Sequence, residues 1–362
     1  MVKKLTAISL FSGAGGLDVG FDRAGFHTVF ANEFDHDAAN TWRANRQNIS
    51  DVMVEGDILA HIDKVNKFAG SVDVLFAGPP CQGFSVAGKM DPSDTRSEHV
   101  FTYLDAVNRV KPKVFVMENV AALGSLARWA SVRERIISIA NDMGYNVAFN
   151  VWHTCEFGVP QNRDRVIFVG ILKGDPADFS IAMKKYMKAA PTARQILLSV
   201  GAYGSSINPE TCTAKITLAK NPVLRASPYA GMLVNGAGRP ICLDKLPPTL
   251  PATMGGNKTP IVDQQALNDP SRQNWFESYH ELVTKWHSVK PLINSKCSQI
   301  DSISVPNYLR RISIKEAAAI QTFPNDYIFK GAKSKQYRQI GNAVPSLFAE
   351  AVARSVIDCY LA

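Results

Sequence analysis

Short apolar runs alternate with amphipathic stretches through the first half of the chain, and most of the runs end at a glycine, a proline or an acidic residue. Apolar runs separated by helical periodicity predict an α/β sheet covered by helices on both faces. The expected strands are 5–11, 27–31, 52–54, 72–77, 114–117, 146–153 and 165–172, and the expected helices are 16–24, 37–45, 100–110 and 131–143.

This alternation stops from about residue 175 to residue 305, where proline, glycine, serine and threonine become frequent. A segment of that length is too long for a plain loop in a compact domain, so the pattern predicts a second, smaller domain of irregular or short-strand structure. Helical patterns return at 313–321 and 346–361. We therefore expect a first domain at 1–175, an irregular domain at 176–307, a hinge region at 308–334 and a C-terminal return to the first domain at 335–362.

Special or polar residues follow the predicted strands of the first half. In an open α/β sheet, ligands bind beyond the carboxyl ends of the strands. Five such residues fall at or just after strand ends, and they predict a site at this edge of the sheet: Gly13, Glu33, Asp57, Cys81 and Glu118.

The composition is that of a globular protein, with 362 residues of which 46% are hydrophobic and 20% charged. We see no apolar stretch long enough to span a bilayer and only a poor match to a signal peptide. The six cysteines form no Cys-x-x-Cys pair, and no histidine cluster has zinc-ligand spacing. These features predict a protein of the reducing cytoplasm without a metal site.

The basic excess lies mainly in one region. The net charge is +8, and residues 171–305 hold 15 Lys or Arg against 9 Asp or Glu, a net charge of +6. An excess of this size suits a polyanionic partner, because neutralised phosphates would dominate affinity. A solubilising surface explains the charge equally well.

Candidate chemistry begins with the run Gly78-Pro79-Pro80-Cys81 directly after a predicted strand. Prolines cannot continue a strand ladder, so they deliver Cys81 onto a loop at the rim of the sheet. A cysteine placed in this way is typical of a nucleophile, whereas structural free cysteines are buried in apolar surroundings. The alternative is a cysteine in a tight turn.

A glycine loop at 12–16 opens the first helix, and its spacing departs from the dinucleotide fingerprint. Glu33 at the next strand end could accept both hydroxyl protons of a ribose, Phe34 could stack on a purine, and Asp57 could accept from an adenine amino group. Together they point to a nucleoside cofactor such as S-adenosylmethionine. The alternative is a glycine turn with ordinary surface carboxylates.

Two further motifs carry charged groups. Glu118 ends an apolar strand, where partial desolvation should raise its pKa and let it hydrogen-bond a ring nitrogen. Arg163 and Arg165 share one face if their segment is extended, and could bind a phosphate or a base carbonyl. The alternatives are a helix N-cap for Glu118 and a surface ion-pair ladder through Asp164 for the arginines.

These motifs together make the chain resemble a bacterial-type DNA cytosine-5 methyltransferase. The matching segments appear in the family's order and leave only 173–307 unmatched: 11–17, 32–35, 56–58, 78–85, 118–120, 161–165, 310–324 and 339–345. The resemblance implies a Rossmann-like, S-adenosylmethionine-dependent fold with a mixed sheet, and a target-recognition domain at 176–307. It also implies a restriction-modification setting.

The resemblance implies covalent catalysis, in which Cys81 adds to carbon 6 of a flipped-out cytosine. Glu118 would hold N3 and the amino group, and Arg163 and Arg165 would fix the base carbonyl and the nearby backbone. No base for the carbon 5 proton is identified, and water could serve. Segment 82–99 would close as a lid, with Gln82, Ser85 and Arg96 contacting DNA.

The family's cofactor contacts carry over to a larger set of positions: Phe11, Ser12, Gly13, Gly15, Gly16, Leu17, Glu33, Phe34, Asp57, Ile58, Pro79, Leu104, Asn342 and Val344. In the unmatched region, the candidate base or phosphate contacts are Arg225, Asn235, Arg239, Thr249, Leu250 and Lys258. For any single one of them, a solvated surface residue is the simpler interpretation.

Three rivals stay open. An RNA cytosine-5 methyltransferase would share the architecture, although the large recognition segment favours double-stranded DNA. A catalytically silent DNA-binding relative would not need Cys81, Glu118, Arg163 and Arg165. An amino-directed methyltransferase should carry an Asn/Asp-Pro-Pro-aromatic motif. We expect a monomer, with any cognate restriction endonuclease encoded separately.

Overall fold

The computed structural model describes residues 4–80, 98–293 and 303–361, and the chain divides into two compact units. Unit 1 comprises Met1–Ala190, Gln321–Gly331 and Asn342–Ala362, and unit 2 comprises Pro191–Ile320 and Ala332–Gly341. The C-terminal part of the chain therefore contributes to both units. In the described part of the chain, every helix is too short or too polar to cross a membrane.

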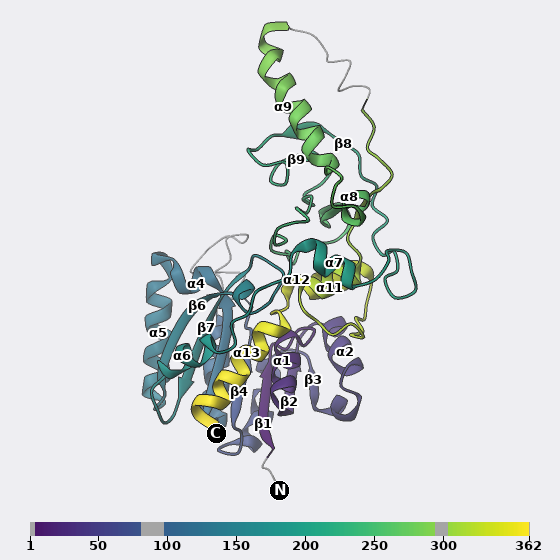
Figure 1. The fold of residues 1–362 in the computed structure, drawn as a ribbon. Helices are drawn as coiled ribbons and strands as arrows, with labels where there is room; N and C mark the ends of the chain where they lie inside the picture. The colour runs from purple at the N-terminus through teal and green to yellow at the C-terminus, as the bar shows by residue number, and fades with distance from the viewer. Residues whose placement is uncertain (1–3, 81–97, 294–302, 362) are drawn as a thin grey trace. The chain divides into compact units, whose positions relative to one another are not determined.

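Unit 1 is built on a mixed seven-stranded sheet of order β3-β2-β1-β4-β5-β7-β6 (Figure 1). Strands β1 to β5 are parallel, whereas β7 runs antiparallel to both β5 and β6. The strands are β1 (Leu5–Leu10), β2 (Phe26–Glu33), β3 (Met53–Glu55), β4 (Val74–Ala77), β5 (Val114–Val120), β6 (Asn146–His153) and β7 (Asp164–Ile171).

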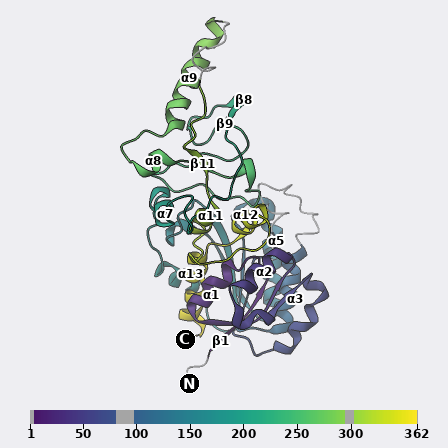
Figure 2. The same cartoon turned by 90° about the vertical axis from the view of Figure 1, so that its right-hand side faces the viewer.

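Helices cover both faces of this sheet, with α1 and α13 on one face and α3 on the other (Figure 2). The period of two along each strand sends neighbouring residues to opposite cores, so Leu75 packs in one hydrophobic cluster and Phe76 in the other. The helices of unit 1 are α1 (Gly16–Ala24), α2 (His36–Ala44), α3 (His99–Val110), α4 (Ala121–Ser125), α5 (Ala130–Asp142), α6 (Asp178–Lys184) and α13 (Ser346–Val356).

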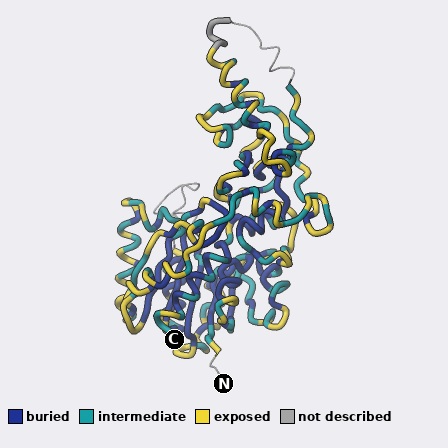
Figure 3. Tube along the Cα trace, in the orientation of Figure 1, coloured by how far each residue is buried: buried dark blue, intermediate teal, exposed yellow. Residues whose placement is uncertain are grey.

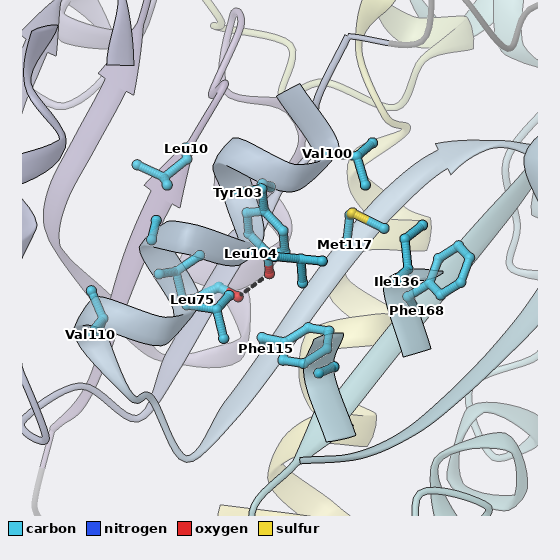
Figure 4. Close-up of a cluster of buried hydrophobic side chains, with 14 of the residues drawn as sticks. Leu10, Leu75, Val100, Tyr103, Leu104, Val110, Phe115, Met117, Ile136 and Phe168 are labelled. Atoms are coloured by element: carbon cyan, nitrogen blue, oxygen red, sulfur yellow. Dashed lines mark hydrogen bonds between the residues drawn. The ribbon is translucent and has the colours of Figure 1, made fainter. Parts of the chain in front are cut away.

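The strands β4, β5 and β7 are almost entirely buried, whereas most residues of the edge strand β6 are exposed or half-buried (Figure 3). In the core on the α3 face, the hydroxyl of Tyr103 is buried and donates to the carbonyl oxygens of Leu75 at 2.9 Å and Val116 at 3.0 Å (Figure 4). A buried phenol needs such acceptors, because an unpaired polar group in an apolar core costs about 1–3 kcal/mol. This contact ties α3 to the two central strands.

Unit 2 contains two small two-stranded sheets, β8-β9 and β10-β11. A separate apolar cluster, which includes Phe276, Tyr279 and Val283 of α9, forms its core. Its elements are α7 (Ala193–Ser199), β8 (Leu218–Val223), β9 (Met232–Val234), β10 (Ile261–Asp263), α8 (Gln264–Asn268), α9 (Trp275–Ile293), β11 (Leu309–Arg311), α11 (Ile314–Ile320) and α12 (Lys333–Asn342).

The expected mixed α/β architecture is confirmed, but the pattern was wrong in two respects. Strand β5 continues to Val120, so Glu118 lies inside the strand and is not the N-cap of a helix. The region expected to be irregular contains the 19-residue helix α9. Its apolar residues pack around one side of the helix, but proline, glycine and serine in the flanking segments hide that period in a sequence window.

Candidate active site

Strand β4 leads directly into Gly78, Pro79 and Pro80, at the carboxyl edge of the parallel strands. Pro79 is buried, and its carbonyl oxygen accepts a hydrogen bond from Nδ2 of Asn119 at 3.2 Å. Oδ1 of Asn119 accepts in turn from the backbone N–H of Val120 at 2.9 Å. Asn119 therefore fixes the segment that leads to Cys81, a role that the motif alone did not suggest. Cys81, Gln82, Ser85 and Arg96 lie outside the described residues.

Glu118 faces Arg165 across the β5-β7 pair. Nε of Arg165 lies 2.6 Å from Oε1 of Glu118, and both side chains are largely buried, with 13% and 10% of their surface exposed. Burial raises the pKa of Glu118, and the charges of Arg165 and Arg163 oppose that rise without cancelling it. The expected upward shift is confirmed in direction. A buried carboxyl group with a raised pKa can carry a proton and donate it in a hydrogen bond.

Gly78 keeps space open beside this carboxyl group. A Cβ atom at position 78 would lie 3.1 Å from Oε2 of Glu118. The same carboxyl group is thus bordered by Gly78 on one side and by Arg165 on the other. The structure brings together the loop that precedes Cys81, the acidic group and one of the two predicted arginines.

Arg163 precedes β7 and is almost completely buried. Its Nη1 donates to Oε1 of Gln161 at 3.3 Å. Oδ1 of Asp164 instead lies 2.7 Å from Nδ1 of His153, on β6. The alternative of an ion-pair ladder through the Asp164 carboxylate is therefore not what the structure shows, because both arginines are directed to other partners.

The glycine loop and Glu33 form one unit. Oε2 of Glu33 accepts from the backbone N–H of Gly13 at 2.7 Å, and Oε1 accepts from that of Asp35 at 2.8 Å. Burial raises the pKa of Glu33. Each carboxylate oxygen has a second lone pair, so this arrangement orients Glu33 and still leaves acceptor capacity for a diol.

The other predicted cofactor residues separate into surface and interior positions. Phe34 is 74% exposed, which leaves its ring free to stack. Gly56 donates its N–H to the carbonyl of Glu33 at 2.9 Å, which places Asp57 next to it, and Oδ1 of Asp57 accepts from the N–H of Leu59 at 2.9 Å. Ile58 and Leu104 are buried in the hydrophobic core on the α3 face (Figure 4 labels Leu104).

The remaining residues of the loop are held by their surroundings. Phe11 has a positive φ of 52° and contacts the ring of His99 edge-on, and Ser12 hydrogen-bonds Ser9. Gly15 also has a positive φ, of 85°. A Cβ at Gly16 would lie only 2.5 Å from the carbonyl oxygen of Val344, and Leu17 and Val344 pack in the same core. Asn342 is exposed.

The candidate DNA contacts in unit 2 differ in availability. Arg225, Thr249 and Lys258 are exposed. Leu250 is fully buried, so its side chain supports the turn from inside. Arg239 donates to the carbonyl of Gly231 at 3.0 Å, and Asn235 bonds the backbone at Lys215 and Thr217. Arg239 and Asn235 therefore have structural partners within unit 2.

The sequence and the fold of this chain are similar to those of known proteins. A family model described as C-5 cytosine-specific DNA methylase matches residues 5–358. The chain is 32% identical to the Type II methyltransferase M1.HphI of Haemophilus parahaemolyticus, over 98% of this chain and 87% of that protein. It is 31% identical to the Type II methyltransferase M.Eco47II of Escherichia coli, over 97% and 78% respectively. The S. pombe Dnmt2 methyltransferase has the same fold, with a TM-score of 0.65, 15% identity, and coverage of 98% of this chain and 99% of that one.

Proposed function

The chain belongs to the C-5 cytosine-specific DNA methylase family and is a DNA cytosine-5 methyltransferase, and we propose that it modifies one short target sequence in double-stranded DNA. The relatives' description as Type II methyltransferases supports a role in a restriction-modification system, with a separately encoded endonuclease. The observation that carries the mechanism is the buried Glu118–Arg165 pair beside the segment that leads to Cys81.

The described residues fit S-adenosylmethionine as the cofactor. When bound, this cofactor supplies an electrophilic methyl group on its sulfonium. The oriented carboxylate of Glu33 would receive the ribose hydroxyls, and the exposed ring of Phe34 would stack on the adenine. Gly13 has a positive φ angle, and among the described residues no atom lies within 4 Å of where its Cβ would stand, so the backbone there could approach the ligand without a side chain.

Cys81 is the proposed nucleophile. Its thiolate would form a bond to carbon 6 of cytosine, which breaks the conjugation of the ring and makes carbon 5 a carbon nucleophile. After carbon 5 is methylated, loss of its proton and cleavage of the Cys81–carbon 6 bond would restore the aromatic ring and the thiolate. The group that accepts the carbon 5 proton is not assigned, and water is sufficient in principle.

Glu118 is proposed to activate the ring for this attack. A carboxyl group whose pKa is raised can donate a proton to the N3 atom of cytosine, which draws electron density away from carbon 6. Arg165 holds the carboxyl group in place through its Nε atom, and Arg163 adds a second positive charge near the same group. Both arginines could also meet the base carbonyl.

The target cytosine must leave the duplex to reach these groups, at a cost of a few kcal/mol. Unit 2 carries the exposed residues Arg225, Thr249 and Lys258, and we propose that this unit contacts the target DNA. Residues 171–305, most of which belong to unit 2, carry a net charge of +6, which supports such a role because phosphate neutralisation dominates affinity for DNA.

Bisulfite sequencing of DNA from cells that express this chain tests the proposal. Cytosines protected in one recurring context would establish the activity and the target together, and cells expressing Cys81→Ser should show complete conversion. No protection with folded protein present would refute the DNA substrate, and transfer to tRNA would then identify an RNA methyltransferase. Specific DNA binding without transfer to either nucleic acid would identify a silent relative.

A further inference from the structure

Residues 321–331 form a strap whose position in the chain is unusual. They belong to unit 1, yet the chain on both sides of them, Pro191–Ile320 and Ala332–Gly341, belongs to unit 2. The chain therefore passes from unit 2 into unit 1 at the start of the strap and returns to unit 2 at its end. Its hydrogen bonds within unit 1 reach both the glycine loop and the arginine segment.

Tyr327 connects the strap to the glycine loop. Its side chain is buried, and its hydroxyl donates a hydrogen bond to the carbonyl oxygen of Ala14 and accepts one from Nη1 of Arg46 at 3.3 Å. Arg46 is held by Asp22 at 2.8 Å and lies over the ring of Trp42 at 4.8 Å. The loop is thus fixed to a charged, buried support.

Tyr327 and Arg46 approach the loop so closely at Gly15 that no larger residue fits there without a shift. A Cβ at this position would lie 2.8 Å from the hydroxyl of Tyr327 and 2.8 Å from Nη1 of Arg46. Glycine loses more conformational entropy on ordering than any other residue, so a loop with positive φ at Gly13 and Gly15 needs external contacts to keep one shape. Tyr327 supplies such a contact to the carbonyl between these two glycines.

Helix α2 and the residues that follow it hold the strap down. Asn45 accepts from the N–H of Ile328 at 2.9 Å and donates to its carbonyl at 2.8 Å. Thr41 accepts from the N–H of Lys330 at 2.8 Å. These contacts to the backbone of the strap fix its position against helix α2. They thereby also fix the position of the Tyr327 hydroxyl.

Gln321, at the other end of the strap, reaches the arginine segment. Its Oε1 accepts from Nε2 of Gln161 at 2.8 Å, and Gln161 accepts from Nη1 of Arg163 at 3.3 Å. Its Nε2 donates to the carbonyl of Ala343 at 3.0 Å, one residue before Val344. A buried chain of amides therefore runs from the strap to Arg163.

We infer that Tyr327 and Gln321 are positioning residues, Tyr327 for the cofactor loop and Gln321 for Arg163, and that the strap holds both in their working geometry. This inference rests on the proposed function, because it takes the glycine loop as the cofactor site and Arg163 as a group that meets the base. Neither residue contacts the reacting atoms. Tyr327 should therefore act on the affinity for the cofactor, and Gln321 should act on the turnover number.

Tyr327→Phe tests the first half, with binding of S-adenosylhomocysteine measured by calorimetry. The variant removes only the hydroxyl and leaves a buried carbonyl without its donor, so the dissociation constant should rise about tenfold. Tyr145→Phe is the matched control, because the buried hydroxyl of Tyr145 also donates to a backbone carbonyl, that of Pro112, at 2.6 Å. The control should lose stability and keep wild-type affinity.

Gln321→Met tests the second half, because methionine has a similar volume and cannot hydrogen-bond the two amide partners. The turnover number at saturating cofactor should fall about tenfold while the KM for S-adenosylmethionine stays within twofold of wild type. A purely structural role would lower stability and leave both constants of the folded fraction unchanged. Equal effects on both constants would also overturn the assignment.

Asn45→Ala is a second test of the same inference, which applies if Tyr327→Phe does not fold. It loosens the strap at an exposed contact and should weaken S-adenosylhomocysteine binding about threefold. If wild type binds S-adenosylhomocysteine and neither Tyr327→Phe nor Asn45→Ala changes the affinity, the inference is refuted. If wild type itself binds none, the proposed cofactor is refuted instead, so the two failures are distinguishable.

Discussion

Replacing Arg165 by methionine should make stability depend on pH in a way that reveals the buried carboxyl group. Arg165 contacts Glu118 at 2.6 Å, and both side chains are mostly withdrawn from water. Removing one partner of a buried ion pair typically costs about 3–5 kcal/mol, because the other charge is left without compensation. Glu118 can escape part of this cost by taking up a proton, so the loss depends on pH.

The sign of this dependence follows from linkage. The folded-state pKa of Glu118 is already raised by burial, and removing a positive neighbour raises it further in Arg165→Met. A raised folded-state pKa contributes stability that is present at low pH and lost as pH rises. The gap between wild type and variant should therefore widen with pH, by about 1.4 kcal/mol per unit between the two folded-state values.

Urea denaturation followed by far-ultraviolet circular dichroism at pH 5.5 and pH 8 measures this gap. The double variant Glu118→Gln/Arg165→Met leaves no carboxylate to strand, so at pH 8 it should be more stable than Arg165→Met alone. Arg109→Met is the matched control, since Arg109 pairs with exposed Asp105 and Asp63, and its loss should change stability little and equally at both pH values. A gap that is equal at both pH values, or a double variant no more stable than the single one, would refute the reasoning.

Three other changes address the remaining parts of the site. Cys81→Ser should abolish methyl transfer and leave specific DNA affinity within about threefold by gel shift, and full activity would exclude a covalent route. Glu33→Ala should weaken S-adenosylhomocysteine binding at least about tenfold by calorimetry while DNA affinity holds, since it removes both the proposed diol acceptor and the acceptor of the Gly13 N–H; equal loss of both affinities would argue against a cofactor role. Gly16→Ala should lower the thermal midpoint, because its Cβ would meet the backbone of Val344 at 2.5 Å, and an unchanged midpoint would show that this packing relaxes freely.

Most of the sheet of unit 1 was predictable because apolar runs of strand length are bounded by residues that break strands. The run before Gly78 and Pro79 is an example, and the resulting strand β4 ends at Ala77. The end of β5 was not predictable, because Glu118 and Asn119 look like the end of an apolar run. They stay in the strand because their backbones pair with β7, a contact that lies about fifty residues away in sequence.

The candidate site could be predicted only where a short local motif indicates the chemistry of a residue. A cysteine after two prolines and a glycine loop after a strand are local features. Arg46 and Tyr327 carry no comparable signal, since a tyrosine or an arginine outside any motif is an ordinary residue of the core or surface. Gln161 lies in the motif 161–165, but the chemistry of that motif was assigned to its two arginines. Their importance comes from the partners that folding assigns to them, and those partners are remote in sequence.

The reversed direction of β7 explains how the acid and the arginines come together at all. Glu118 lies near the end of β5, whereas Arg165 lies near the start of β7, and in a parallel pair those positions would fall at opposite edges of the sheet. With the two strands aligned in parallel, Arg165 would lie opposite Phe115, about three residues and roughly 10 Å away from Glu118. Antiparallel pairing instead sets Arg165 opposite Val120 and Ile167 opposite Glu118, on one face of the sheet. The mixed sheet therefore brings the start of β7, and Arg165 with it, to the edge where the parallel strands end.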